Sequence, residues 1–280
     1  MSFIADLADA WQRNQSLVCV GLDPDPARIP SHLPRNNAGI AEFCRAIVDA
    51  THDLVCCYKP QIAHFAALGA EQELQQLIEY IHARYPGVPV ILDAKRGDIG
   101  STAEKYAVEA FDRYRADAVT VNPYLGQDAA EPFLRRADRG VVLLCKTSNA
   151  GSADLQDLLV GDTPLYERLA AQIAGQWNGN GNCLLVVGAT WPAQLARIRK
   201  LVGDMPLLVP GVGAQGGDVR QVVSAGCTAA GTGLIISSSR AILYASGAAD
   251  FALAARRETE QLRSQINSSR GVVTSSGSST

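Results

Sequence analysis

Short apolar runs recur along the chain and alternate with segments of helical periodicity. Eight runs are rich in β-branched residues or leucine, and they lie at 17–22, 54–58, 88–92, 118–121, 141–145, 183–187, 207–209 and about 229–236. Between runs, apolar residues repeat at three- and four-residue steps, as in Leu74, Leu77, Ile78 and Ile81, and again in Leu195, Ile198 and Leu201. Nearly continuous apolar strands that alternate with helices predict a parallel sheet buried on both faces.

The number of these units favours one α/β architecture. Eight β/α units are the count of a (β/α)8 TIM barrel, so we expect a single barrel domain over residues 1–264. A doubly wound sheet is the alternative, but the turn after the first run, Gly21-Leu22-Asp23-Pro24-Asp25-Pro26, is not a G-x-G-x-x-G turn. The Ser/Thr/Gly-rich segment 265–280 has little to bury, and we expect it to be a disordered tail.

The spacing of the runs is uneven in one place. Some forty residues separate the fifth run from the sixth. Their first part, Asn149-Ala150-Gly151-Ser152, is predicted to be an active-site loop, and the Gly/Asn tract 178–182 a turn before the sixth strand.

Composition excludes several classes of function. The 280 residues are 47% hydrophobic and 19% charged with a formal charge of -3, which is typical of a globular protein and gives no basic surface for nucleic acid. No apolar stretch approaches the roughly 20 residues of a membrane span, and the first residues do not resemble a signal peptide, so a cytoplasmic protein is expected. The seven cysteines have no C-x-x-C spacing and the four histidines no H-x-x-x-H spacing, which predicts buried, reduced thiols and no metal site.

The run at 88–92 is followed at once by Asp93-Ala94-Lys95-Arg96-Gly97-Asp98. Charged residues at the carboxyl end of a barrel strand are typical of catalysis. Side chains alternate along a strand, so Asp93 and Lys95 should point to the same side, while Gly97 should let the chain turn and carry Asp98 away. Opposite charges near 4 Å attract by about 4 kcal/mol at an effective dielectric near 20. That attraction favours the protonated amine, which makes Lys95 a proton donor rather than a Schiff-base nucleophile.

The last two strands carry features expected of a phosphate site. Four glycines fall within residues 211–217, after the seventh strand, and Arg240 follows the eighth. Loops after these two strands commonly hold phosphate in TIM barrels, although tight turns and a surface ion pair would look the same. Other polar residues follow the remaining strands and converge on the same mouth: Asp23, Lys59, Asn122 and Lys146-Thr147-Ser148-Asn149.

These residues together resemble a known family. The motif Asp93-x-Lys95-x-x-Asp98-Ile99-x-x-Thr102, with Asp23 and Lys59 upstream, the Pro210–Gly217 loop that carries Gln215, and Arg240, is similar to the orotidine 5'-phosphate decarboxylases. The resemblance spans about Val18 to Arg240. The D-x-K-x-x-D core also occurs in sugar-phosphate decarboxylases of the same superfamily, whereas its combination with Lys59 and the Gln-bearing loop is specific. The variant motif from Leu92 to Ala103 and the long insertion after the fifth strand resemble the bacterial type 2 subgroup.

The resemblance implies an activity and a role for each residue. The activity is cofactor-free decarboxylation of orotidine 5'-phosphate to UMP in de novo pyrimidine biosynthesis, through a C6 carbanion protonated by Lys95. By resemblance, Lys59, Asp93, Lys95 and Asp98 form a charged tetrad, and Asp98, Ile99 and Thr102 reach into the active site of the other subunit of a homodimer. The remaining implied contacts are Asp23 with ribose, Ser148 with the pyrimidine, and Gln215 and Arg240 with phosphate.

Two other functions remain open at this point. One is a metal-dependent decarboxylase of a sugar acid phosphate from the same superfamily, which needs a divalent metal and carboxylate ligands near the third strand. The other is a phosphosugar-binding barrel without catalysis, which has no need of Lys95 between two aspartates.

Overall fold

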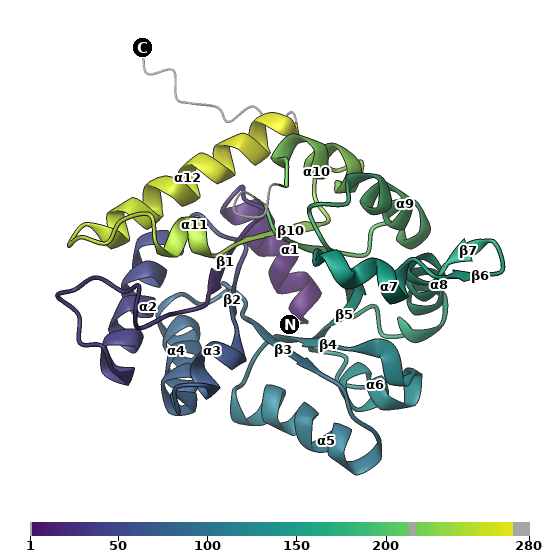
Figure 1. Cartoon of the computed structure of the whole chain (residues 1–280), viewed down its shortest axis with the longest axis horizontal. Coiled ribbons are helices and arrows are strands. Elements are labelled where there is room, and N and C mark those ends of the chain that lie inside the picture. The colour runs from purple at the N-terminus through teal and green to yellow at the C-terminus, as the bar shows by residue number, and fades with distance from the viewer. Residues whose placement is uncertain (1, 213–216, 271–280) are drawn as a thin grey trace.

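The computed structural model describes residues 2–212 and 217–270, and its centre is a closed parallel barrel (Figure 1). The strands of the barrel are β1 (Val18–Leu22), β2 (Cys57–Pro60), β3 (Ile91–Arg96), β4 (Ala118–Val121), β5 (Gly140–Lys146), β8 (Cys183–Val187), β9 (Leu207–Pro210) and β10 (Leu234–Ser238). They are hydrogen-bonded in the order β2-β1-β10-β9-β8-β5-β4-β3. Parallel bridges from Tyr58 to Val90 and from Gln61 to Asp93 join β2 to β3 and close the ring. The predicted TIM barrel is therefore confirmed.

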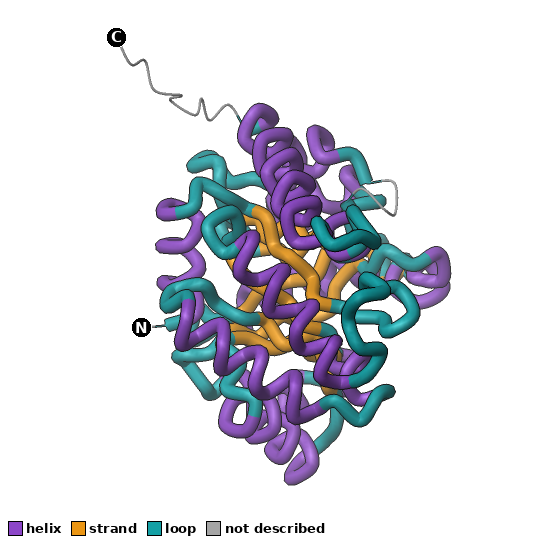
Figure 2. Tube along the Cα trace, turned by 90° about the vertical axis from the view of Figure 1, so that its left-hand side faces the viewer, coloured by secondary structure: helices purple, strands orange, loops and turns teal. Residues whose placement is uncertain are grey.

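Helices surround the strands, and Figure 2 shows the strands enclosed by them. The α-helices are α1 (Phe3–Arg13), α2 (Asn37–Thr51), α3 (Ile62–Ala66), α4 (Glu71–Arg84), α5 (Gly100–Val108), α6 (Gln127–Leu134), α7 (Ala153–Gln156), α8 (Leu165–Gln172), α9 (Pro192–Val202), α10 (Val219–Gly226), α11 (Arg240–Leu243) and α12 (Phe251–Ser269). Short π-helical turns, η1 (Glu109–Arg113) and η4 (Ile173–Trp177), continue α5 and α8. Two 3-10 turns, η2 (Pro123–Leu125) and η3 (Ala150–Ser152), follow β4 and β5.

Helix α1 covers the amino-terminal end of the barrel, where Figure 1 shows it across the centre of the ring. Its buried residues, Phe3, Leu7, Ala10 and Trp11, recur at helical spacing, and Ser2 caps its first turn. The side chain of Asn14, directly after the helix, donates to the carbonyl of Val55 just before β2, over 2.7 Å. Because this end is closed, the site must lie at the opposite, carboxyl end of the strands.

The two helices predicted from apolar periodicity are present as α4 and α9, but the buried face of α9 differs from the prediction by one residue. Leu74, Leu77, Ile78 and Ile81 are all buried in α4. In α9 the buried stripe ends on Val202, whereas Leu201 is 43% exposed, so its assignment to the core face was wrong. The four-residue step from Ile198 to Val202 follows the helical turn better than the three-residue step does.

The end of β3 and the end of α12 differ from the boundaries predicted from the sequence. Strand β3 extends to Arg96, so Asp93 and Lys95 lie within the strand rather than after it. Helix α12 continues to Ser269, five residues into the predicted tail, because Ile266 is buried and Asn267 donates to the carbonyl of Gln15 over 2.9 Å. Residues 271–280 lie outside the described residues, and the prediction of disorder there stays a prediction.

The insertion after β5 forms its own small structure at the rim of the barrel. It contains η3, α7, the antiparallel hairpin of β6 (Leu159–Val160) and β7 (Thr163–Pro164), and α8 with η4. A turn at residues 179–181 then leads into β8, as the Gly/Asn tract predicts.

All seven cysteines are free; six are buried and Cys227 is partly exposed. Across residues 2–212 and 217–270, no helix has the length and apolarity needed to cross a bilayer.

Candidate active site

Asp93 binds two lysines, one on each carboxylate oxygen. Lys59, on the neighbouring strand β2, donates from Nζ to Oδ2 over 2.9 Å, and Lys95 donates from Nζ to Oδ1 over 2.7 Å. The side chains of Lys59 and Asp93 are 7% and 10% exposed, whereas that of Lys95 is 47% exposed. Lys95 therefore combines a fixed carboxylate partner with access to a ligand at the barrel mouth.

The charges of this cluster support one another. Burial disfavours the ionised Asp93 carboxylate, but the ammonium groups of Lys59 and Lys95 outweigh it and hold the pKa of Asp93 well below its ordinary value. Burial likewise disfavours the Lys59 ammonium, yet Asp93 and then Asp23 outweigh it and raise the pKa of Lys59 above its ordinary value. At neutral pH, Lys59 and Asp93 are thus charged.

A shift of register in β3 brings Asp93 and Lys95 together. Leu92 pairs with Val119 and Arg96 with Val121, so three residues of β3 lie opposite one residue of β4, Thr120. The predicted proximity of Asp93 and Lys95 is confirmed, but simple strand alternation is not its cause, because Lys95 has a left-handed φ of 47°. The expected turn at Gly97 also differs, since the other left-handed residue here is Gly100, with φ 54°.

Thr120 holds this irregular segment. Its hydroxyl donates to Asp93 Oδ1 over 2.9 Å and accepts the backbone N–H groups of Ala94 and Lys95, each over 2.9 Å. One donor and two acceptor positions are all that a hydroxyl offers. Thr120 therefore uses its full capacity to fix the conformation of the strand that carries Asp93 and Lys95.

Two cavities meet at the Lys59–Asp93 pair. One, of about 480 Å³, extends toward β1 and β10. The other, of about 490 Å³, extends toward β4 and β5. Both are lined by Lys59, Asp93 and Pro210. An extended ligand that occupied both cavities would have its middle beside the charged cluster.

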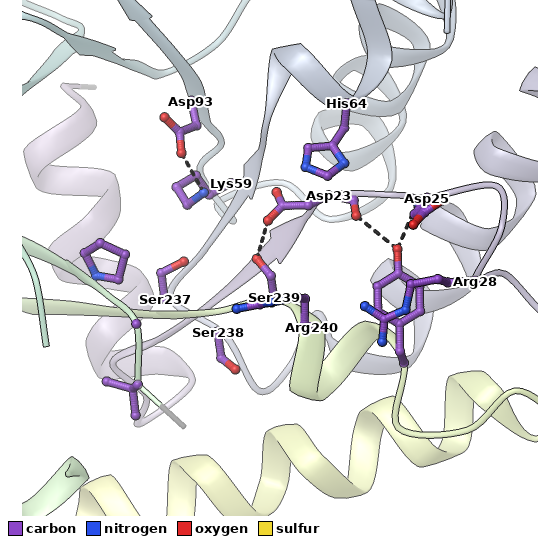
Figure 3. Close-up of a pocket in the computed structure, with 14 residues that line it drawn as sticks. Asp23, Asp25, Arg28, Lys59, His64, Asp93, Ser237, Ser238, Ser239 and Arg240 are labelled. Carbon is purple, nitrogen blue, oxygen red and sulfur yellow. Dashed lines mark hydrogen bonds and ion pairs between the residues drawn. The ribbon is translucent and has the colours of Figure 1, made fainter. Parts of the chain in front are cut away.

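The first cavity has polar groups for an anion and for hydroxyls (Figure 3). Asp23, after β1, accepts from the Ser239 hydroxyl through Oδ2 over 2.6 Å, while its Oδ1 is buried and has no hydrogen-bond partner among the described residues. Arg240, the first residue of α11, lines the same cavity. Gly211, with φ 97°, begins the loop after β9, and Gly217 donates back to its carbonyl over 3.3 Å. Gln215 lies outside the described residues.

The second cavity joins amide and hydroxyl groups to an apolar floor. Ser148, Asn149 and Gln156 line it on one side, and apolar strand residues line the other: Leu144, Val186 and Leu208. Gly188 allows Ser148 to approach, because a Cβ on Gly188 would lie 2.7 Å from the Ser148 Cα. The Gly188 N–H also donates to the Lys146 carbonyl over 2.7 Å. Such a wall suits a flat, partly polar ring.

Three predicted residues line neither cavity. Asp98 accepts the N–H of Ile99 over 2.8 Å, Ile99 is 61% exposed, and Thr102 lies exposed on the first turn of α5. One chain therefore brings together three charges of the predicted tetrad, and Asp98 is apart from them. Asn122, which had no assigned role, accepts the N–H of Tyr124 and caps η2.

Sequence reasoning missed Thr120 and Gln156. Thr120 lies in the apolar run Ala118–Val121, where a threonine is an ordinary strand residue and gives no signal. Gln156 is eight residues after Ser148, and only the fold of the insertion brings it to the same wall.

Comparisons with known proteins agree with this geometry. The model of the "Orotidine 5'-phosphate decarboxylase / HUMPS family" matches residues 16–255. The chain is 63% identical over 270 residues to the orotidine 5'-phosphate decarboxylase of Azoarcus sp. (strain BH72), covering 96% of this chain and 100% of that protein. It is 62% identical over 267 residues to that of Dechloromonas aromatica (strain RCB), covering 95% and 99%. The solved structure of Leishmania donovani OMP decarboxylase is 42% identical with a TM-score of 0.85, covering 97% of this chain and 100% of that chain.

Proposed function

Because the chain belongs to the orotidine 5'-phosphate decarboxylase family, we propose a role in that reaction for each group at the barrel mouth. The activity of the chain is that of its family, the decarboxylation of orotidine 5'-phosphate in pyrimidine biosynthesis. The observation that carries the assignment of roles is the Asp93 carboxylate, held between Lys59 and Lys95 where the two cavities meet.

The substrate is proposed to span both cavities. Its phosphate lies near Arg240, which can form a bidentate, charge-assisted pair with it. Gln215 is proposed as a second phosphate ligand from the family resemblance alone. The ribose hydroxyls bond Asp23, whose free Oδ1 requires a donor, and the pyrimidine lies in the other cavity against Ser148.

This position brings the substrate carboxylate beside Asp93. Two carboxylates at close range repel each other, and loss of CO2 relieves that repulsion. The C6–carboxyl bond breaks, its electron pair stays on C6, and the Lys95 ammonium stabilises the developing negative charge. Lys95 then transfers a proton to C6 to give UMP, and the neutral amine regains a proton from water. Lys59 and Thr120 keep Asp93 ionised and in place throughout.

We also propose that two copies of the chain share their active sites. Support comes from Asp98, Ile99 and Thr102, which lie outside the cavities of their own chain, with Ile99 exposed despite its apolar side chain. In the proposed homodimer these residues enter the site of the other subunit, and Asp98 completes the tetrad there. A cytoplasmic location is proposed as well, because the phosphorylated substrate and product do not cross membranes unaided.

The direct test is an assay of purified protein with orotidine 5'-phosphate, which follows the loss of orotate absorbance. The assay should be repeated with excess EDTA, because the metal-dependent alternative needs free carboxylate ligands near β3. Both oxygens of Asp93 are bound by ammonium groups, which favours the metal-independent reaction. Unchanged turnover in EDTA supports the proposed roles; turnover that EDTA abolishes and Mg²⁺ restores contradicts them.

A further inference from the structure

Lys146 is a fully buried lysine that the proposed reaction does not use. It is the last residue of β5, and its side chain has no exposed surface. It lines neither of the two cavities described above. A buried ammonium is costly unless it is paired and hydrogen-bonded, so its position requires a partner and a reason.

The partners of Lys146 come from the insertion, including Tyr166 on α8, or from the turn after β8. Its Nζ donates to Asp157 Oδ1 over 2.7 Å and to Ser152 Oγ over 3.1 Å. The same atom lies 4.8 Å from the ring centroid of Trp191 and 5.9 Å from that of Tyr166, within the range of cation–π attraction. One ammonium group therefore binds the far end of segment 147–157 to the strand at which the segment begins.

Bonds next to Lys146 fix the near end of the same segment. The Thr147 N–H donates to Gln156 Oε1 over 2.9 Å, and Gln156 Nε2 donates to the Thr147 hydroxyl over 2.9 Å. The indole N–H of Trp191 donates to the Thr147 carbonyl over 2.9 Å. Segment 147–157 is thus a loop closed at its base, and the Lys146–Asp157 pair is the charged part of that closure.

The closed loop carries polar groups that face the catalytic cluster. Ser148, Asn149 and Gln156 lie on it, and all three line the cavity that also contains Lys95. If the base of the loop opens, these side chains lose their common wall, while Asp23 and Arg240 in the other cavity are unaffected. A disturbance at Lys146 should therefore reach one half of the site only.

We propose that Lys146 is a positioning residue, whose buried pair with Asp157 holds loop 147–157 in the conformation that presents Ser148, Asn149 and Gln156 to the pyrimidine. This rests on the proposed placement of the pyrimidine in that cavity. Lys146 touches no reacting atom. It determines recognition of the base through the loop it anchors.

The test compares a ligand that carries the pyrimidine base with one that lacks it. Calorimetry measures the binding of UMP and of ribose 5-phosphate to the wild type and to Lys146→Met, Asp157→Asn and, as a surface control, Lys200→Met. Methionine keeps the length of the chain without the charge, and Lys200 is exposed on α9. A polar group of the base that is left unpaired on binding lowers affinity by about 10- to 100-fold. We expect UMP affinity to fall about 10- to 100-fold in the two loop variants, with ribose 5-phosphate within about twofold of wild type and the control unchanged.

The outcomes separate this inference from the proposed function. A selective loss of UMP binding supports it. Unchanged UMP binding in both loop variants, or an equal loss of both ligands, overturns it. If Lys146→Met does not fold, Asp157→Asn decides alone, because Asp157 is partly exposed and asparagine retains a neutral acceptor. If the wild type binds UMP no more tightly than ribose 5-phosphate, the placement of the pyrimidine itself fails, whatever the variants do.

Discussion

The hydroxyl of Thr120 donates a hydrogen bond to the carboxylate of Asp93 over 2.9 Å. Thr120 also accepts the N–H groups of Ala94 and Lys95, so one side chain on β4 sets both the carboxylate and the backbone that leads to the proposed proton donor. A neutral residue therefore organises the charged cluster.

Replacement of Thr120 by valine keeps the shape of the side chain and removes these three bonds. A hydrogen bond to a charged group contributes about 1.5–3 kcal/mol, so kcat should fall about 10- to 100-fold. Thr120→Ser retains the hydroxyl and should keep most of the activity. Steady-state kinetics with orotidine 5'-phosphate measures both variants. Equal activity of the valine variant and the wild type would show that Thr120 does not organise the catalytic cluster.

Gly188 is predicted to be intolerant of a side chain because Ser148 lies against it. A Cβ there would be 2.7 Å from the Ser148 Cα, and overpacking of this kind costs about 1–3 kcal/mol. Gly188→Ala should raise KM several-fold by displacing Ser148. Gly179→Ala is the matched control, since nothing lies within 4 Å of a Cβ at that position. If KM and UMP affinity are the same in both variants, Ser148 does not contact the base.

The Asp93 carboxylate should stabilise the fold in a pH-dependent way. The pKa of Asp93 is lower in the folded chain than in the unfolded chain. The contribution of Asp93 to stability is therefore fully present above the unfolded pKa of about 4. It is lost as pH falls toward the folded pKa. The pKa of Lys59 is raised, so its contribution is present below about pH 10.5 and is lost as pH rises through the folded value.

Denaturant unfolding of the wild type and of Asp93→Asn measures how much Asp93 contributes to the free energy of unfolding at neutral and acidic pH. Removal of one partner from a buried ion pair costs about 3–5 kcal/mol, so a difference of this size is expected at pH 7. It should shrink steadily between about pH 4 and pH 2. Asp162→Asn, on the exposed hairpin, should change stability by less than about 0.5 kcal/mol. A difference for Asp93→Asn that does not vary with pH would show that the carboxylate is not ionised in the folded protein.

Shared active sites can be tested by mixing two inactive variants. Lys95→Ala removes the proposed proton donor, and Asp98→Ala removes the charge proposed to act in the other subunit. After the variants are unfolded together and refolded, hybrid dimers should contain one complete site each and regain measurable turnover. Each variant refolded alone is the control. Mixtures that stay inactive would mean that Asp98 acts within its own chain.

The barrel and the location of most of the charged groups at its mouth could be predicted from the sequence. Eight apolar runs predicted eight strands, and the positions of Asp23, Lys59 and Asp93 at strand ends predicted a common mouth. The family resemblance is confirmed by the match over residues 16–255. The roles implied for the individual residues stay predictions.

The other features of the site could not be predicted from the sequence, because they depend on tertiary contacts that leave no periodic pattern in it. The left-handed φ of Lys95 arises from the shift of register against Thr120, and a threonine in an apolar strand looks like any other strand residue. The contact of Gly188 with Ser148 joins residues forty positions apart. The buried pairing of Lys146 depends on how the insertion folds back over β5, which neither its composition nor its length predicts.

Turnover of Lys95→Ala tests whether Lys95 is the proton donor. Loss of orotate absorbance should be followed with orotidine 5'-phosphate, and UMP binding should be measured in parallel by calorimetry. We expect turnover to be abolished while UMP still binds, because the other ligand contacts of both cavities remain and the proton donor is missing. Near-normal turnover in this variant would show that Lys95 is not the proton donor.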